Sequence, residues 1–118
     1  MATIMVVDDA MFMRKRCSQM LIENGYQVIE ACNGADAVAK YKQFKPNAVL
    51  LDITMPDMDG LQALKELRSL DPNVRVAMCT AMGQQNIVIE ALKSGARDFV
   101  VKPFDASRVI AAVKKILS

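Results

Sequence analysis

Hydrophobic residues along the chain form two kinds of pattern that alternate with each other. Short, largely apolar runs, typical of strands buried within a parallel sheet, place strands at residues 3–7, 27–31, 48–52, 74–80 and 98–101. Each run is followed by a segment with apolar residues three or four positions apart, as on one face of an α-helix. The sequence therefore predicts five strand–helix units in succession.

The expected helices have apolar stripes and are bounded by turn signals. The stripes are Met13, Cys17, Met20 and Leu21; Ala37, Val38, Tyr41 and Phe44; Leu61, Leu64, Leu67 and Leu70; Ile87, Ala91 and Leu92; and Val109, Val113, Ile116 and Leu117. Asn24-Gly25, Asn33-Gly34, Asp59-Gly60 and Ser94-Gly95 mark turns, and Asp105 is expected to cap the last helix. This alternation predicts an α/β fold: a doubly wound, five-stranded parallel sheet with helices on both faces.

Composition narrows the classes of protein that remain. The 118 residues suit one compact domain over positions 1–118, and a hydrophobic content of 53% with 24% charged residues argues against disorder. A net charge of +2 is too small to indicate nucleic-acid binding. No apolar run approaches the roughly 18 residues needed to span a bilayer, and no signal peptide is visible, so we expect a cytoplasmic protein.

Cysteine and histidine usage constrains the chemistry. Cys17, Cys32 and Cys79 lack metal-type spacing and are expected to be buried small hydrophobes in a reducing compartment. Histidine is absent, which removes imidazole acid–base catalysis and the usual nitrogen ligands for metals. A bound metal would therefore be held by oxygen atoms, and a hard cation such as Mg²⁺ is the expected one.

Four of the five expected strands end in a polar residue suited to chemistry. The first ends at Asp8 and Asp9, the third at Asp52, the fourth at Thr80 and the fifth at Lys102. The carboxyl ends of the strands share one edge in a doubly wound sheet, which is where ligands bind. Asp52 follows four apolar residues of the central strand, and we expect the other polar residues to gather around it.

The chemistry of this set indicates phosphoryl transfer. Two carboxylates about 4 Å apart repel by roughly 4 kcal/mol at an effective dielectric near 20, so the cluster favours a divalent cation. Asp9 and Asp52 could hold Mg²⁺ and still leave positions for water or phosphate oxygens. The Lys102 ammonium and the Thr80 hydroxyl suit a phosphate group. A carboxylate nucleophile, a metal and a lysine together describe transfer of a phosphoryl group onto Asp52.

Each of these residues also has an ordinary structural interpretation. Asp8-Asp9 could be no more than a helix cap, and Asp52 could be a turn residue. The joint pattern favours a chemical role over these structural interpretations.

Two other functions of proteins with related folds fit the sequence less well. A flavodoxin-like cofactor carrier would need a phosphate loop rich in Ser, Thr and Gly after the first strand, where this chain has two aspartates. An aspartate-based phosphatase usually has its nucleophile on the first strand, together with a large cap domain.

Five motifs resemble the receiver domain of two-component response regulators, and the likeness is strongest to the CheY-like chemotaxis type. The motifs are Val6-Val7-Asp8-Asp9, Leu50 to Pro56, Asp59-Gly60, Thr80-Ala81 and Lys102-Pro103-Phe104. The resemblance covers essentially the whole chain. It implies a flavodoxin-like sheet with strand order 2-1-3-4-5.

The resemblance also implies the roles of the site residues. Asp52 would accept a phosphoryl group from a phosphohistidine on a histidine kinase. Asp9, Asp52 and the backbone carbonyl of Thr54 would hold Mg²⁺, with Asp8 acting through water. Thr80 would then respond to the phosphate.

Further implications concern the readout of the phosphate. Thr80 and Phe99 would change position on phosphorylation, and Phe99 stands where a tyrosine phenol could otherwise donate a hydrogen bond. The Lys102–Pro103 peptide bond would be cis. Thr54 and Met82 occupy two positions that vary within the family and tune the lifetime of the phosphate.

The expected protein is thus a phosphorylation-activated signalling switch and not an enzyme, although it assists its own phosphorylation and dephosphorylation. Its expected partners are a histidine kinase and a target such as a flagellar motor switch component or a phosphatase. We expect it to act as a monomer that binds neither nucleic acid nor a membrane directly. A phosphorelay intermediate and a receiver domain cut from a longer regulator remain alternative outputs.

Overall fold

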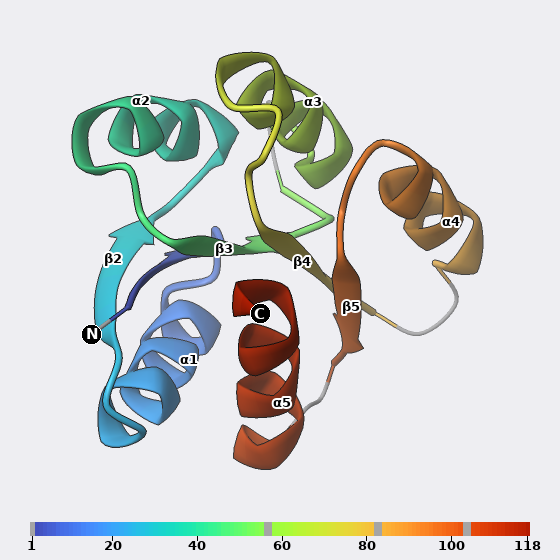
Figure 1. Cartoon of the computed structure of the whole chain (residues 1–118). Helices are drawn as coiled ribbons and strands as arrows, with labels where there is room; N and C mark the ends of the chain where they lie inside the picture. Colours follow the sequence, from blue (N-terminus) through green and yellow to red (C-terminus); the bar gives the residue numbers. More distant parts are fainter. Residues whose placement is uncertain (1, 56–57, 82–83, 103–104) are drawn as a thin grey trace.

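The computed structural model describes residues 2–55, 58–81, 84–102 and 105–118 (Figure 1). Two predictions fall outside these residues: the tuning position Met82 and the cis bond to Pro103. No helix in these four segments is long and apolar enough to cross a bilayer.

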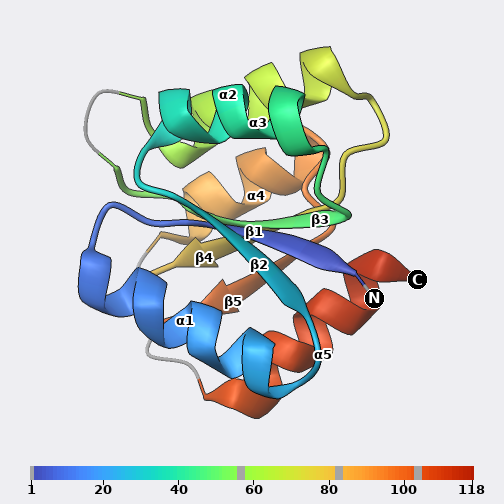
Figure 2. The same ribbon diagram turned by 90° about the vertical axis from the view of Figure 1, so that its left-hand side faces the viewer.

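Strands and helices alternate along the whole described chain. Their order is β1 (Thr3–Val7), α1 (Met11–Glu23), β2 (Gln27–Ala31), α2 (Gly34–Phe44), β3 (Ala48–Asp52), α3 (Gly60–Leu70), β4 (Val76–Thr80), α4 (Gln85–Lys93), β5 (Asp98–Val101) and α5 (Ala106–Leu117). The five strands form one parallel sheet in the order β2-β1-β3-β4-β5. Helices α1 and α5 cover one face, and α2, α3 and α4 cover the other (Figures 1 and 2). The predicted α/β fold and strand order are confirmed.

The two faces of the sheet bury separate apolar cores because side chains alternate along a strand. Met5 and Val49 lie in the core under α2, α3 and α4, whereas Ile4 and Leu50 lie in the core under α1 and α5. Every residue of β3 and β4 is buried. The central strands therefore form a rigid base at whose carboxyl end Asp52 stands.

The loop after β3 is tied closely to the strand that carries Asp52. Gly60 begins α3, and its N–H donates to the carbonyl oxygen of Ile53 at 2.8 Å. A Cβ at position 60 would lie 2.2 Å from the backbone oxygen of Asp52, so only glycine allows this approach. Asp59 caps the same helix, accepting from the Gln62 N–H at 2.9 Å. The first turn of α3 is thereby fixed against the end of the central strand.

Two further helices begin at a residue whose side chain caps the helix. Asp105 caps α5 as predicted, accepting a hydrogen bond from the Arg108 N–H at 3.0 Å. Asn33 caps α2 by accepting from the Asp36 N–H at 2.7 Å. Side-chain caps therefore set the start of three helices, because α3 is capped in the same way.

Several expectations about burial were wrong. Phe44, Leu70 and Leu92 were expected in buried stripes but are 52%, 44% and 40% exposed. Each lies in the last two residues of its helix. Cys32 is exposed because it follows the edge strand β2, whereas Cys17 and Cys79 are buried as expected.

The fourth strand is shorter than predicted. It begins at Val76 and not at Val74, because the Val74 N–H donates to the Asp71 carbonyl oxygen in a turn. Val74 is nonetheless buried, and its hydrophobic character extended the apolar run in the sequence without extending the strand.

Candidate functional site

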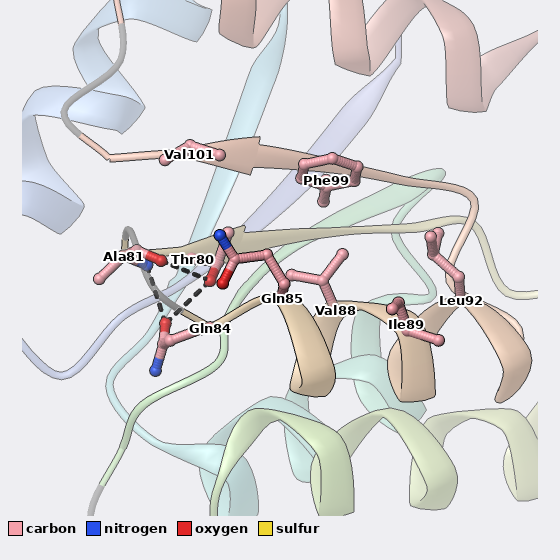
Figure 3. A pocket seen from close by; sticks show the side chains of 9 residues that line it. All are labelled: Thr80, Ala81, Gln84, Gln85, Val88, Ile89, Leu92, Phe99 and Val101. Carbon is pink, nitrogen blue, oxygen red and sulfur yellow. Dashed lines mark hydrogen bonds between the residues drawn. The ribbon is translucent and has the colours of Figure 1, made fainter.

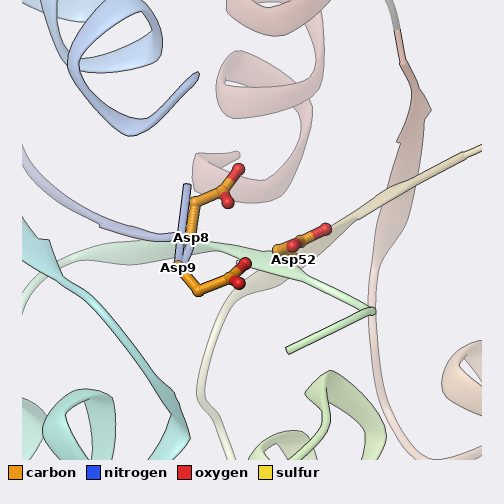
Figure 4. A group of neighbouring side chains, drawn as sticks. All are labelled: Asp8, Asp9 and Asp52. Carbon is orange, nitrogen blue, oxygen red and sulfur yellow. The ribbon is translucent and has the colours of Figure 1, made fainter. Parts of the chain in front are cut away.

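Three carboxylates gather at the carboxyl edge of the sheet (Figure 4). Asp8 and Asp9 follow β1, and Asp52 ends β3; Val7 pairs with Leu51 in the register of these neighbouring strands. One oxygen from each carboxylate lies within 4.8 Å of the others. Asp8 and Asp52 are buried, and Asp9 is exposed. The predicted acidic cluster therefore forms, with one member open to solvent.

The Lys102 ammonium joins the two buried carboxylates. Its Nζ lies 3.0 Å from Asp8 Oδ2 and 3.1 Å from Asp52 Oδ1. Lys102 follows β5, two strands away from β3, so its long side chain reaches across the end of β4. The other oxygen of Asp8 accepts a hydrogen bond from the Ala10 N–H at 2.9 Å. Asp8 is thus held on both oxygens, while the described residues donate to Asp52 only at Oδ1.

Burial and charge shift the pKa values of Asp52 and Lys102. Burial raises the pKa of the Asp52 carboxyl; the Lys102 charge opposes the rise, and the Asp8 and Asp9 charges add to it. Burial alone would lower the pKa of Lys102, but its hydrogen bond to Asp8 and the charge of Asp52 outweigh this and raise it. Lys102 therefore remains a cation at neutral pH. Its charge does not cancel the effect of burial on Asp52, whose carboxyl pKa stays above its usual value.

Oxygen chemistry and charge both fit a hard divalent cation. Three carboxylates and one ammonium leave two negative charges unbalanced, which a divalent cation would neutralise. The side-chain ligand atoms that the described residues gather here are carboxylate oxygens, which Mg²⁺ prefers. Thr54 lies two residues after Asp52 and is exposed; its carbonyl as a fourth ligand group stays a prediction.

The buried cysteines near this edge are poor candidates for a nucleophile. Burial, aided by the charge of Asp8, raises the pKa of the Cys17 thiol to about 12. Burial also raises the pKa of Cys79, whose strand position pairs with Asp52. Both thiols are protonated at neutral pH, so the carboxylate of Asp52 is the stronger candidate.

Thr80 is buried at the end of β4 but does not bond to Asp52 within the described residues. Its Oγ1 donates to Gln84 Oε1 at 2.8 Å, with the Ala81 carbonyl oxygen at 3.1 Å as a second acceptor (Figure 3). Gln84 also accepts from the Ala81 N–H at 2.8 Å, and its Nε2 donates to Thr54 Oγ1 at 2.9 Å. Sequence analysis missed Gln84, since no motif distinguishes a glutamine in a loop.

The other predicted switch residue lies beside the same network. Phe99, in β5, is half-buried and pairs with Met78 in the register of β4 and β5. Thr80 and Phe99 both line a cavity of about 460 Å³ between α4 and the β4–β5 edge (Figure 3). The other lining residues are Ala81, Gln84, Gln85, Val88, Ile89, Leu92 and Val101. The predicted switch residues therefore share one largely apolar hollow.

Comparison with known families identifies the kind of domain. The sequence pattern described as the response regulator receiver domain matches residues 4–114. The chain belongs to this receiver domain family. The acidic cluster, the strand order and the lysine after β5 are the features that the sequence motifs had predicted for such a domain.

Individual relatives narrow the type of receiver domain. The chain is 53% identical over 116 residues to the chemotaxis protein CheY of Bacillus subtilis, covering 98% of this chain and 97% of the relative. It is 52% identical over 114 residues to CheY of Thermotoga maritima, covering 96% and 95%. A crystal structure of a CheX–CheY–BeF₃–Mg²⁺ complex from Borrelia burgdorferi matches with a TM-score of 0.94 and 37% identity, covering 99% of this chain and 90% of that one. The protein is thus a CheY-like receiver domain, a signalling protein.

The structure places the predicted site residues in two groups. Asp8, Asp9, Asp52 and Lys102 lie together in the receiver domain, as the strand ends predicted. Thr80 lies at the same sheet edge but is bonded to the loop before α4. The chemical roles assigned to these residues stay predictions, and they form the basis of the proposal below.

Proposed function

We propose that the protein is a phosphorylation-activated switch of a two-component system, acting as a single receiver domain. Asp52 accepts a phosphoryl group from a phosphohistidine on a histidine kinase. The observation that carries this proposal is the Asp52 carboxylate at the end of the central strand, bonded to Lys102 and flanked by two further carboxylates. Such a site suits a reaction in which negative charge accumulates and a cation balances it.

The proposed step is a displacement at phosphorus. A carboxylate oxygen of Asp52 forms the new O–P bond while the N–P bond of the phosphohistidine breaks, and the imidazole nitrogen keeps the electron pair. Asp52 Oδ2 is the favoured oxygen, because Oδ1 already accepts from Lys102. Lys102 then attracts the oxygens of the transferred group, since its ammonium lies 3.1 Å from the acceptor carboxylate.

Mg²⁺ is the proposed cofactor. Asp9, Asp52 and the backbone carbonyl of Thr54 would hold it directly, and Asp8 would act through water. When bound, the ion neutralises charge on the carboxylates and on the incoming phosphoryl oxygens. The exposure of Asp9 supports this arrangement, because it leaves the cluster open to an ion and its water ligands.

Chemotaxis is the proposed pathway. Relatives that match about half of the residues over nearly the full chain are named chemotaxis protein CheY. We infer that the phosphodonor is a chemotaxis histidine kinase, and that the target is a flagellar motor switch component or a phosphatase. A CheY relative forms a complex with CheX, which supports a target that binds the receiver domain in its activated form.

A small donor with an N–P bond tests the chemistry without the kinase. Phosphoramidate contains the same type of bond as phosphohistidine, and intact-mass spectrometry counts the groups transferred. We expect a single Mg²⁺-dependent addition to the wild type and no addition to Asp52→Asn, which keeps the shape but lacks the nucleophile. Addition at equal rates in a chelator, or to both proteins alike, would overturn the proposal.

A further inference from the structure

The side chain of Gln84 forms a bridge between two loops at the candidate site, and Figure 3 shows its bonds to Thr80 and Ala81. Its Oε1 accepts from the buried Thr80 hydroxyl and from the Ala81 N–H, both at 2.8 Å. Its Nε2 donates to the hydroxyl of Thr54 at 2.9 Å. One amide thus connects the threonine expected to sense the phosphate with the loop that follows Asp52.

The orientation of this amide is fixed by its partners. The Ala81 backbone N–H only donates, so the group that faces it has to be the carbonyl oxygen of Gln84. With that oxygen in place, the amide nitrogen points to Thr54 Oγ1. The Thr80 hydroxyl must then donate its single proton toward Gln84 or the Ala81 carbonyl, and this proton is not available to a group on Asp52.

We infer that Gln84 is a positioning residue that holds Thr80 in its unphosphorylated position and so sets the threshold for switching. This inference rests on the proposed function, because it assumes that Thr80 turns toward a phosphoryl group on Asp52. The bond from Thr80 to Gln84 exists only while the hydroxyl points away from that group. Any interaction made only in the unphosphorylated state opposes the movement of Thr80 toward the phosphoryl group.

The surroundings of the two partners determine the direction of the effect. Thr80 is only 2% exposed, so its hydroxyl needs a partner inside the protein. Gln84 is half-buried, so its amide regains water when Thr80 leaves. Replacing Gln84 by alanine therefore weakens the resting position of Thr80 without removing a contact that the switched position requires.

Beryllofluoride titration measures this threshold directly. BeF₃⁻ with Mg²⁺ adds to an aspartate carboxylate as a mimic of the phosphoryl group, and fluorine NMR detects the bound form. The Phe99 ring signals report whether the switch has followed. Gln84→Ala should reach half-conversion at a roughly 2- to 10-fold lower BeF₃⁻ concentration, the range expected for one net hydrogen bond.

Asn86, two residues further along, provides a matched control. It is exposed, it lies in the first turn of α4 outside the hollow that Thr80 and Phe99 line, and its side chain forms no hydrogen bond within the described part of the chain. Asn86→Ala should titrate like the wild type. An unchanged midpoint in Gln84→Ala would overturn the inference.

A double-mutant cycle separates positioning from support of the helix, since Gln84 also stands at the N-cap of α4. If Gln84 acts through the hydroxyl, Gln84→Ala should have no effect on the midpoint in a Thr80→Val background. A shift of the same size with and without the hydroxyl would mean that Gln84 only supports α4, and would refute the inference. Failure of the wild type to bind BeF₃⁻ at all would instead refute the proposed function.

Discussion

Replacing Asp9 by alanine should stabilise the metal-free protein and reduce the further stabilisation that Mg²⁺ brings. Asp9 faces two carboxylates with oxygens within 4.8 Å. At that separation each pair repels by about 0.9 kcal/mol in bulk water and about 3.5 kcal/mol at a dielectric near 20. Asp9 is exposed, so the lower figure applies: two such pairs repel by about 1.7 kcal/mol, of which the Lys102 ammonium beside both buried carboxylates cancels about half, so the metal-free variant should gain about 1 kcal/mol. For a chain of this size this corresponds to a melting temperature roughly 4 °C higher.

The same substitution removes a direct metal ligand. Mg²⁺ at tenfold its dissociation constant should stabilise the wild type by about 1.4 kcal/mol, or roughly 5 °C. We expect Asp9→Ala to retain less than half of that rise. Calorimetric melting with a chelator and with a Mg²⁺ series measures both quantities for each protein.

The control is Glu90→Ala, which removes an exposed acidic side chain of α4 and changes the net charge equally. It should keep the full Mg²⁺ response. Equal Mg²⁺ responses in Asp9→Ala and the wild type would place the metal elsewhere. A metal-free Asp9→Ala protein that melts below the wild type would refute the repulsion argument.

Four further substitutions test the switch and the fold. Lys102→Ala should still be labelled by a phosphodonor, but the Phe99 ring signals should no longer respond; a normal response would contradict the role of the ammonium. Thr80→Ala should still be labelled but should lose most of the change in target affinity on phosphorylation, which is roughly 5- to 150-fold for couplings of this kind. Phe99→Ala should weaken the same change. Target binding with and without BeF₃⁻ measures both effects. Tyr41→Phe removes the 2.7 Å hydrogen bond that chiefly lowers the pKa of Asp71. Its cost of about 1 kcal/mol should appear in urea unfolding above the ordinary pKa of 3.8 and vanish as the pH falls through the lowered value; a cost that persists at low pH would refute this.

Strand positions were predictable because burial on both faces leaves a plain signal in the sequence. The run that ends at Asp52 is apolar throughout, as a central parallel strand requires, and the structure buries every residue of it. The parallel topology then brings Asp8, Asp52 and Lys102 to one edge without further information. Site residues at the ends of strands can therefore be predicted from the sequence alone.

Features that depend on loop geometry and on helix length were not predictable. Gln84 lies in the loop after β4, and only the folded chain shows that its amide meets Thr80 and Thr54. Phe44 continues an apolar stripe in the sequence, but it is the last residue of α2 and its side chain is exposed. Periodicity predicts which face of a helix is apolar, and it does not predict where the neighbouring element ends.

Mapping the phosphorylated residue tests the central claim most directly. The protein is incubated with phosphoramidate and Mg²⁺, the acyl phosphate is trapped by borohydride reduction, and the modified residue is located by tandem mass spectrometry. We predict that the reduced residue is Asp52 alone and that the signal disappears in Asp52→Asn. Modification at Asp8, Asp9 or Thr80 in the wild type, or undiminished labelling of Asp52→Asn, would contradict the account.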